Sequence, residues 1–265
     1  GIGVVYQPQW LTGFSMSVDY YRIKNNGSVA SPSFAYVLSQ CYAGVQAYCS
    51  QVARLPPTGG ATLGNLDSIT TGAQNQASTT AQGVDYELSY RAPVSTIVPS
   101  LNGDLALRVV ATNVLNRITD SGIPGPTQIL DAAGVGSSPR WGVNMSATYS
   151  LDPVRVTWTG RFISRGRAQS TLLQCTSSCP SVSGFQTVDN NQIPSYFLHN
   201  LSVTYRFYQD GTDNAEAFFN IDNLFDRAPP VAPNQVAGAT YGLATNAALF
   251  DTLGRRFRAG IRFKM

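Results

Sequence analysis

The closing segment of the chain alternates between apolar and basic residues with a period of two. One parity holds the apolar side chains, Phe257, Ala259, Ile261, Phe263 and Met265. The other parity holds the basic side chains, Arg256, Arg258, Arg262 and Lys264. Because successive side chains of a β-strand point to opposite faces, this segment predicts a strand with one apolar and one positively charged face. A strand of this kind suits a membrane barrel, which has lipid outside and a wet interior.

The composition excludes several classes of protein. Only 12% of the 265 residues are charged, which is about half the usual share for a soluble domain. The formal net charge of +3 is too small to argue for a nucleic-acid partner. No window approaches the ~18–20 consecutive apolar residues that a membrane-spanning helix needs. The chain begins without Met and already within a strand-like pattern, so we expect it to be the C-terminal portion of a longer protein.

The four cysteines form two close pairs in the sequence, Cys41 with Cys49 and Cys175 with Cys179. Short local pairs in stretches rich in Gly, Ser and Thr favour two loop disulfides in an oxidising compartment. A four-thiolate metal site is the alternative, but neither spacing is the C-x-x-C of a typical zinc site. We therefore expect the two local disulfides and no bound metal.

Alternating segments recur along the chain and predict about nine strands. We place them near residues 3–9, 14–20, 84–91, 104–112, 141–149, 154–162, 197–207, 215–222 and 256–264. Four long connections separate them, about residues 25–79, 117–138, 166–193 and 226–254, and these alternate with short turns. One short turn is Asp152-Pro153, a pair typical of tight turns.

The alternation of long and short connections predicts a transmembrane antiparallel β-barrel. Outer-membrane barrels have short periplasmic turns and long extracellular loops, and their strands of roughly 9–11 residues cross the bilayer at a tilt. The long loops are then extracellular and the C-terminus is periplasmic. Aromatic residues at the periplasmic strand ends would form an interfacial girdle, namely Tyr90, Tyr149, Tyr205, Phe207 and Phe263.

Two segments share the pattern Asn, two apolar residues, Asn or Asp, and then Arg. They are residues 112–117 and 222–227. Asn and Asp side chains favour turns, so the repetition predicts a turn at the exit of two strands rather than a binding site.

Several segments together resemble TonB-dependent outer-membrane receptors. The run 218–227, the connection that follows it and the strand 254–263 resemble the C-terminal end of that family. The segment 83–90, Gly-Val-Asp-Tyr-Glu-Leu-Ser-Tyr, resembles the family's G-x-[DE]-x-E strand. The resemblance implies that residues 1–265 are the C-terminal part of a barrel of about 22 strands, closed by an N-terminal plug that this chain lacks.

The resemblance also implies a function and partners. The family imports scarce, bulky ligands across the bacterial outer membrane, driven by the TonB complex through the N-terminal region. The implied partners are outer-membrane lipid, the remaining barrel strands, the plug, TonB, the barrel-assembly machinery and a small-molecule ligand. Four residues of the closing strand would form the assembly signal, Phe257, Ile261, Phe263 and Met265, although many outer-membrane proteins end in an aromatic residue rather than Met.

Nothing in the chain indicates an enzyme or a resident cofactor. The single histidine, His199, falls on the apolar parity of its strand and has no Ser or Cys partner for nucleophilic catalysis, so we expect a structural role. Two other classes stay open: a passive porin or small independent barrel, and a soluble secreted β-protein. A porin would leave an odd strand number and unpaired edges, and a soluble protein would carry polar residues on the outward parity.

Two sets of residues are candidates for contact with the plug or the ligand. Charges on the inward parity are expected to face the plug, namely Asp85, Glu87, Arg108, Arg155, Arg161, Arg206, Glu216, Asp222, Arg256, Arg258 and Arg262. Loop aromatics are expected to contact the ligand, namely Phe34, Tyr36, Tyr42, Tyr48, Phe185, Tyr241 and Phe250. Aromatic faces suit both catechol-type siderophores and sugar rings, so they leave the ligand class open.

Overall fold

A computed structural model describes residues 1–57, 59, 64–122, 129–181, 186–210, 213–231 and 245–264. The chain divides into two compact units. The sheet unit comprises residues 1–23, 81–117 and 131–265, and the helical unit comprises residues 24–80 and 118–130. Each unit is described by itself.

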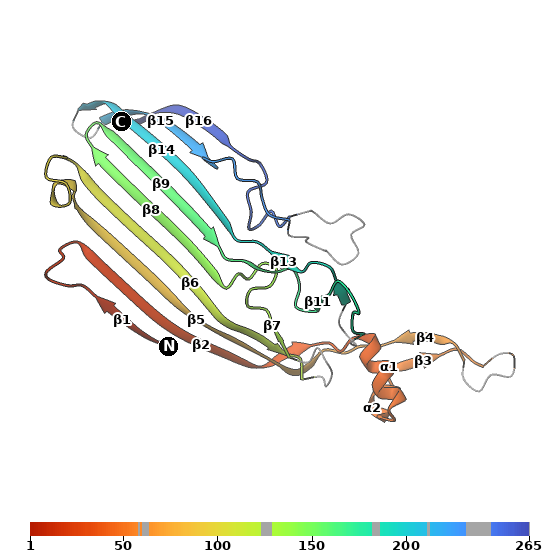
Figure 1. Ribbon diagram of the computed structural model, residues 1–265. Helices are drawn as coiled ribbons and strands as arrows, with labels where there is room; N and C mark the ends of the chain where they lie inside the picture. Colours follow the sequence, from red (N-terminus) through yellow and green to blue (C-terminus); the bar gives the residue numbers. More distant parts are fainter. Residues whose placement is uncertain are drawn as a thin grey trace. The chain divides into compact units, whose positions relative to one another are not determined.

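The main sheet has ten strands, nine of them along one path (Figure 1). In order along that path they are β1 (Ile2–Tyr6), β2 (Phe14–Ala30), β5 (Gln74–Pro93), β6 (Asp104–Asp120), β8 (Trp141–Leu151), β9 (Val154–Ile163), β14 (Tyr196–Asp210), β15 (Asp213–Asp222) and β16 (Arg256–Lys264). The tenth strand, β7 (Ile129–Asp131), pairs with β6. Neighbours in this order are also neighbours in sequence among the long strands, and the sheet is open within the described part of the chain.

The nine expected strands are thereby confirmed, but three of them are longer than the sequence pattern predicts. Strand β2 continues to Ala30, β5 begins at Gln74 and β6 continues to Asp120, so the stretches 25–79 and 117–138 are not loops throughout. A period of two is visible in a sequence only where one face of the strand meets an apolar surrounding. The extensions are rich in Asn, Gln, Ser and Thr, and carry no such contrast.

The same extension corrects the prediction for the repeated Asn-containing segments. Residues 112–117 continue as part of strand β6, whereas residues 222–227 do leave β15 through a turn. In that turn Asn223 and Asp226 adopt φ of 55° and 53°, a conformation that Asn and Asp tolerate better than most residues. The same sequence pattern therefore adopts two different local structures.

The strand register keeps the two parities on separate faces of the sheet. Val203 of β14 lies opposite Val156 of β9 and Phe219 of β15, and Phe219 lies opposite Ala259 of β16. On the other face, Arg206 lies opposite Glu216, which lies opposite Arg262. The outward parity stays open to the surroundings, since Phe257, Ile261 and Phe263 are 60%, 61% and 66% exposed. An apolar ladder of this size facing outward is expected for a lipid-facing surface.

One irregularity changes which aromatic residue belongs to the outward face of β14. The register shifts between Arg206 and Tyr208, so that Tyr208 lies opposite the outward Ala215. Phe207, which the sequence pattern placed in the girdle, falls within the bulge. An extra residue in one strand reverses the parity beyond it, and simple counting along the sequence misses that reversal.

Long and short connections alternate along the sheet. Within the sheet unit, β8 and β9 are joined by residues 152–153 alone, whereas residues 164–195 connect β9 to β14. One end of the paired strands is formed by residues 141–142, 163, 196 and 222. The other end is formed by residues 151–154 and 206. The connection 164–195 contains β10 (Gly166–Arg167), β11 (Leu172–Gln174), β12 (Gln186–Val188) and β13 (Gln192–Ile193).

A small apolar core lies where one end of the sheet meets these connections. Ile163, Ile193, Tyr196 and Phe250 are buried against one another, and the rings of Tyr196 and Phe250 meet edge to face with centroids 5.4 Å apart. This core joins the end of β9 to the start of β14 and to the segments that precede β14 and β16. It anchors parts of the two longest connections in the sheet unit.

The helical unit contains α1 (Phe34–Tyr42), α2 (Gln46–Cys49), β3 (Val52–Arg54) and β4 (Leu66–Ile69). Ser33 caps α1 through its side chain, which accepts a hydrogen bond from the Tyr36 backbone N–H at 3.3 Å, and Val37 is fully buried. Strands β3 and β4 pair as an antiparallel hairpin. Neither helix of the described residues is long and apolar enough to cross a membrane.

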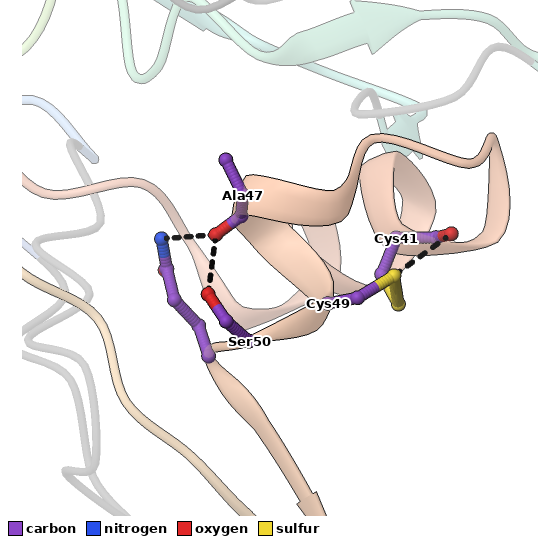
Figure 2. The surroundings of a disulfide bond; sticks show 5 residues. Cys41, Ala47, Cys49 and Ser50 are labelled. Carbon is purple, nitrogen blue, oxygen red and sulfur yellow. Dashed lines mark hydrogen bonds between the residues drawn. A yellow bond between two sulfur atoms is a disulfide. The ribbon is translucent and has the colours of Figure 1, made fainter.

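Both expected cysteine pairs lie at disulfide distance. Cys41 and Cys49 join α1 to α2 with their Cα atoms 4.6 Å apart, and Figure 2 shows the Ser50 hydroxyl donating to the Ala47 carbonyl beside them. Cys175 and Cys179 have Cα atoms 5.6 Å apart and follow β11 directly. No free cysteine is present in the described residues.

The pairing can be checked chemically on the purified protein. A non-reduced digest analysed by mass spectrometry should contain Cys41–Cys49 and Cys175–Cys179 peptides, which reduction separates. Free thiols or crossed links in the folded protein would contradict the pairing. A disulfide that closes so short a loop contributes mainly local order, so hydrogen exchange in residues 34–50 should accelerate after reduction.

The assignment of faces predicts where a positive charge destabilises the fold. Arg at Ile261, near the middle of β16, should reduce the free energy of folding into lipid vesicles by roughly 2–4 kcal/mol, because that side chain faces lipid. Arg at Val156, the third residue of β9, should cost less than Arg at Ile261 but more than Arg at its inward-facing neighbour Thr157. Thr157→Arg is the matched control, because it places the same charge one residue along on the opposite face. Urea titration of the full-length protein should show at most about 1 kcal/mol for the control, the worth of the Thr148–Thr157 hydrogen bond that is lost. Equal costs at both positions would contradict the assignment.

Candidate functional site

The inward face of β15 and β16 carries a row of ion pairs. Arg262 Nη1 lies 2.7 Å from Glu216 Oε1, and Arg258 Nη2 lies 3.1 Å from Asp222 Oδ2. Arg256 lies between two carboxylates, 3.0 Å from Asp251 and 3.9 Å from Asp222. The side chains of Arg258 and Arg262 are about two-thirds exposed, so each pair contributes about 0–1 kcal/mol to stability.

Other inward charges are also paired within the sheet. Arg108 Nη2 contacts Glu87 at 2.9 Å across β6 and β5, and Asp85 accepts a hydrogen bond from the Thr112 hydroxyl at 2.7 Å. Arg206 contacts Asp152 in the short turn between β8 and β9. Among the expected plug-facing residues, only Arg155 and Arg161 make no ion pair or hydrogen bond within the described residues. The face is therefore largely neutralised by its own pairs.

Hydroxyl and amide side chains fill the middle of this face. Thr148 and Thr157 are 3.0 Å apart, Ser202 donates to Asn220 at 2.6 Å, and Asn200 donates to Thr159 at 3.3 Å. These groups are uncharged and partly buried, and each is bonded to a neighbour on the adjoining strand. The centre of the face is thus polar without a strong local field.

Of the described loop aromatics, four lie in the helical unit and Phe250 lies in the sheet unit. Phe34 and Tyr42 of the helical unit are 67% and 96% exposed, whereas Tyr36 and Tyr48 pack edge to face with centroids 5.5 Å apart. Burial, with a further contribution from Tyr48, raises the pKa of Tyr36, so its hydroxyl is neutral near pH 7. Phe250 is 3% exposed within the core, which assigns it to packing rather than to ligand contact. Phe185, Tyr241 and Met265 lie outside the described residues.

His199 packs within an aromatic cluster on the outward parity. Trp158 Nε1 donates to His199 Nδ1 at 3.3 Å, and the His199 ring centroid lies 4.0 Å from Phe197 and 4.9 Å from Phe225. No group of three potential metal ligands occurs within the part of the chain that the structure describes. The contacts of this histidine are those of a packed structural residue.

A cavity lies in the sheet unit, between the connections 131–140 and 164–192. Its volume is about 680 Å³. The lining residues are Ala133, Gly134, Arg140, Arg165, Gly166, Arg167, Leu172, Leu173, Gln174, Asn191 and Gln192. Three arginine residues thus lie around a space large enough for a small molecule.

Backbone hydrogen bonds bring the two connections together. The Arg167 N–H donates to the Gly134 carbonyl and the Gly136 N–H donates to the Arg167 carbonyl, both at 2.8 Å. A Cβ atom on Gly166 would lie 2.6 Å from the Gly134 carbonyl oxygen, so this close approach requires glycine. The arginines on either side of Gly166 are therefore held by a fixed backbone.

Asn191 orders the backbone of residues 168–172 beside the cavity. Its side chain is 3% exposed and satisfies four backbone groups, accepting from Ala168 and Gln169 and donating to the carbonyls of Gln169 and Leu172. Asp131 orders the backbone of the other connection in a similar way. Its Oδ1 accepts hydrogen bonds from the backbone N–H groups of Arg117 and Ala133, both at 2.9 Å. Side-chain bonds to backbone thus order segments without regular secondary structure.

The sequence pattern did not identify this cavity. Arg165-Gly166-Arg167 is visible as a basic pair around a glycine, but nothing along the chain indicates that it lies beside residues 133–140. The structural evidence is a pair of backbone contacts between two long connections. Only the spatial arrangement joins Arg140 to the other two arginines.

Comparison with known proteins identifies related sequences and folds. The family described as TonB dependent receptor-like, beta-barrel matches residues 2–224. No curated protein matches the chain. Solved structures include the ferric enterobactin receptor PfeA of Pseudomonas aeruginosa with bound enterobactin (mutant Q482A; 16% identity, TM-score 0.55, 98% of this chain and 30% of that one). The FrpB iron transporter of Neisseria meningitidis is similar at 12% identity, with a TM-score of 0.53 and the same coverage.

These structural similarities show the fold alone, since identity is below 20%. The chain spans about 30% of the length of the solved structures that it matches. The expectation of an antiparallel barrel wall from the TonB-dependent receptor family is confirmed.

The four hydrogen bonds of Asn191 predict a local effect. Asn191→Ala removes the side-chain partner of the Gln169 N–H and of the Gln169 and Leu172 carbonyls, at a cost of about 1–3 kcal/mol. Hydrogen exchange in residues 168–172 should accelerate accordingly while β8 and β9 stay protected. Asn190→Ala is the control, because that side chain is exposed and accepts a single bond from the Gln192 N–H. Unchanged exchange in the Asn191 variant would refute its role in ordering this segment.

Proposed function

The chain belongs to the family of TonB-dependent receptor-like β-barrels, and we propose that it forms part of an outer-membrane receptor for TonB-dependent import. The imported ligand is a scarce, bulky molecule such as a siderophore–iron complex. The observation that carries the proposal is the two-faced sheet, with an exposed apolar surface opposite an ion-paired polar one. This arrangement suits a wall between lipid and a filled, wet lumen.

The outward face supports a membrane setting over a soluble one. Phe219 and Phe257 stack with centroids 6.1 Å apart on adjacent strands, and both are at least 44% exposed. In water, such a row of open aromatic side chains would promote association between molecules. In lipid, these exposed aromatic side chains meet an apolar environment. The backbone N–H and C=O groups of neighbouring strands form their hydrogen bonds with one another.

The inward face supports a plugged lumen. Wall charges that already pair within the sheet, such as Arg262 with Glu216 and Arg258 with Asp222, need no counter-charge from a plug. A plug resting on the neutral hydroxyl and amide side chains could move without breaking buried ion pairs. We place the plug contacts on this surface, where Arg155 and Arg161, which have no partner among the described residues, would bind carboxylates of the plug.

The orientation follows from the connections. We place the short turn 152–153 in the periplasm and the long connections 164–195 and 223–255 outside, so that β16 descends to the periplasm. Its outward residues Phe257, Ile261 and Phe263 then serve as the assembly signal. The partners are outer-membrane lipid, the rest of the barrel, a plug, the TonB complex and the assembly machinery.

The similar solved structures support an iron-containing ligand. Two of them are described as a ferric enterobactin receptor and an iron transporter. A passive porin is the principal rival, because it would have the same wall. A TonB-dependent receptor and a porin differ in whether uptake of the ligand requires energy, and the geometry of the sheet is the same in both.

Uptake of an iron complex by the full-length protein distinguishes them. Cells that express the protein as their sole receptor should accumulate labelled ferric siderophore with saturation. Accumulation should stop in a strain without TonB or after an uncoupler collapses the proton gradient, while binding at the cell surface persists. Uptake that continues without TonB, in proportion to concentration, would identify a porin and overturn the proposal.

A further inference from the structure

A hydrogen-bonded pair of polar rings lies among the apolar side chains of the outward face of β9 and β14. Trp158 Nε1 lies 3.3 Å from His199 Nδ1, and both side chains are partly exposed on the face that we assign to lipid. Gly160 lies opposite His199, and a Cβ atom on Gly160 would lie 2.7 Å from the Trp158 ring and 2.9 Å from the Phe197 ring. The rings therefore lie over a glycine, where a larger residue would displace them.

The hydrogen bond between the two rings determines where the histidine carries its hydrogen. An indole nitrogen can only donate, so His199 Nδ1 is the acceptor and the imidazole is neutral. The other nitrogen of a neutral imidazole carries the hydrogen, so His199 Nε2 is a donor. This donor has no acceptor among the residues that the structure describes. A membrane interior supplies no water, and an N–H group without an acceptor is strongly disfavoured there.

Aromatic rings surround the donor. The centroid of the His199 ring lies 4.0 Å from that of Phe197 and 4.9 Å from that of Phe225, which is 67% exposed. The planes of the His199 and Phe225 rings are 78° apart, and any N–H···π contact between them is weaker than a hydrogen bond to a carbonyl oxygen. The surroundings of the donor thus favour an apolar chain that also carries a carbonyl group.

The position of His199 along the strands indicates which part of a lipid it meets. Strand β9 has 10 residues, which at the usual tilt cover about 25 Å, the height of the apolar band of an outer-membrane barrel. Gly160, opposite His199, is followed by the strand end at Ile163, so it lies about 8 Å below that end. The long connection 164–195 follows this end, which we place in the outer leaflet. Near this level, ester and amide carbonyl groups join the acyl chains of lipids to their headgroups.

We propose that His199 is the donor of a lipid-binding site, in which its Nε2 donates to an ester carbonyl oxygen of an outer-leaflet glycolipid. Phe197 and Phe225 pack against the acyl chain. Trp158 is a positioning residue, because it fixes the tautomer and the ring orientation of His199 without contacting the carbonyl. The inference rests on the proposed outer-membrane function and goes beyond it, since import of a ligand does not itself require a bound lipid.

Ester-linked and ether-linked lipids test the carbonyl acceptor, because the ether lipid lacks it. The full-length protein with isotope-labelled histidine is placed in nanodiscs of dimyristoyl phosphatidylcholine or of its dialkyl ether analogue. The nitrogen signals of His199 are identified by their absence from the spectrum of the His199→Phe variant. The Nε2 signal should differ between the two lipids, while the Nδ1 signal stays constant. Identical Nε2 signals in both lipids overturn the site.

Titration of purified glycolipid into the delipidated full-length protein tests the source of the carbonyl. Native mass spectrometry should show that His199→Phe raises the dissociation constant about fivefold, as expected for one lost hydrogen bond. His199→Gln should restore most of the affinity, because its amide keeps both a donor and an acceptor. Equal glycolipid affinity in the parent protein and the Phe variant, or preferential binding of phospholipid by the parent protein, overturns the site.

Variants elsewhere on the outward face separate this site from general contact with lipid. Phe219→Leu changes an exposed aromatic residue of β15 and should leave the glycolipid dissociation constant within twofold. Trp158→Phe keeps a ring but removes the indole donor, so the His199 nitrogen signals should show a mixture of tautomers. A single, unchanged tautomer in that variant overturns the positioning role.

The lipid site and the import function fail in different measurements. Uptake of ferric siderophore that depends on TonB, together with glycolipid binding that ignores His199, defeats the lipid site alone. Glycolipid binding that depends on His199, together with uptake that continues without TonB, defeats the import function alone.

Discussion

The ladder of backbone hydrogen bonds between neighbouring strands is the interaction on which the rest of the structure depends. A bilayer offers no alternative partners for peptide groups, so strands that cross it must pair continuously. The register of β9, β14, β15 and β16 meets that requirement without interruption over most of their length. Because the ladder holds the strands in phase, apolar side chains lie beside apolar ones on one face, and most charges on the other face lie within reach of an opposite charge.

Neutralisation of the inward face within the sheet has a mechanical consequence. Asp222 forms an ion pair with Arg258 and a longer one with Arg256. Arg256 also pairs with Asp251, which lies in the connection before β16. These pairs tie the final strand to its neighbour and to its own preceding connection. Apart from Arg155 and Arg161, the expected plug-facing charges make ion pairs or hydrogen bonds within the described residues, so few of them are uncompensated.

Charge is handled differently in the long connections. The side chains of Arg165 and Arg167 have no partners in the described residues, whereas Asp131 is shared among Arg140 and two backbone N–H groups. The backbone around them is held by Asn191 and by the close approach of Gly166 to Gly134. Ordered backbone and unpaired charge thus occur together in these connections, whereas most charges of the inward face are paired across neighbouring strands.

The sequence by itself determined the nine long strands, the two faces, the alternation of connections, the cysteine pairs and the family resemblance. Each depends on neighbours in the chain: a period of two, a turn pair such as Asp152-Pro153, or cysteines a few residues apart. The tertiary structure alone decided the extensions of β2, β5 and β6, the bulge that substitutes Tyr208 for Phe207, and the burial of Phe250. It alone brought Arg140 beside Arg165 and Arg167. The reason is physical: alternation records which face meets lipid, whereas contacts between distant connections leave no periodic trace in the chain.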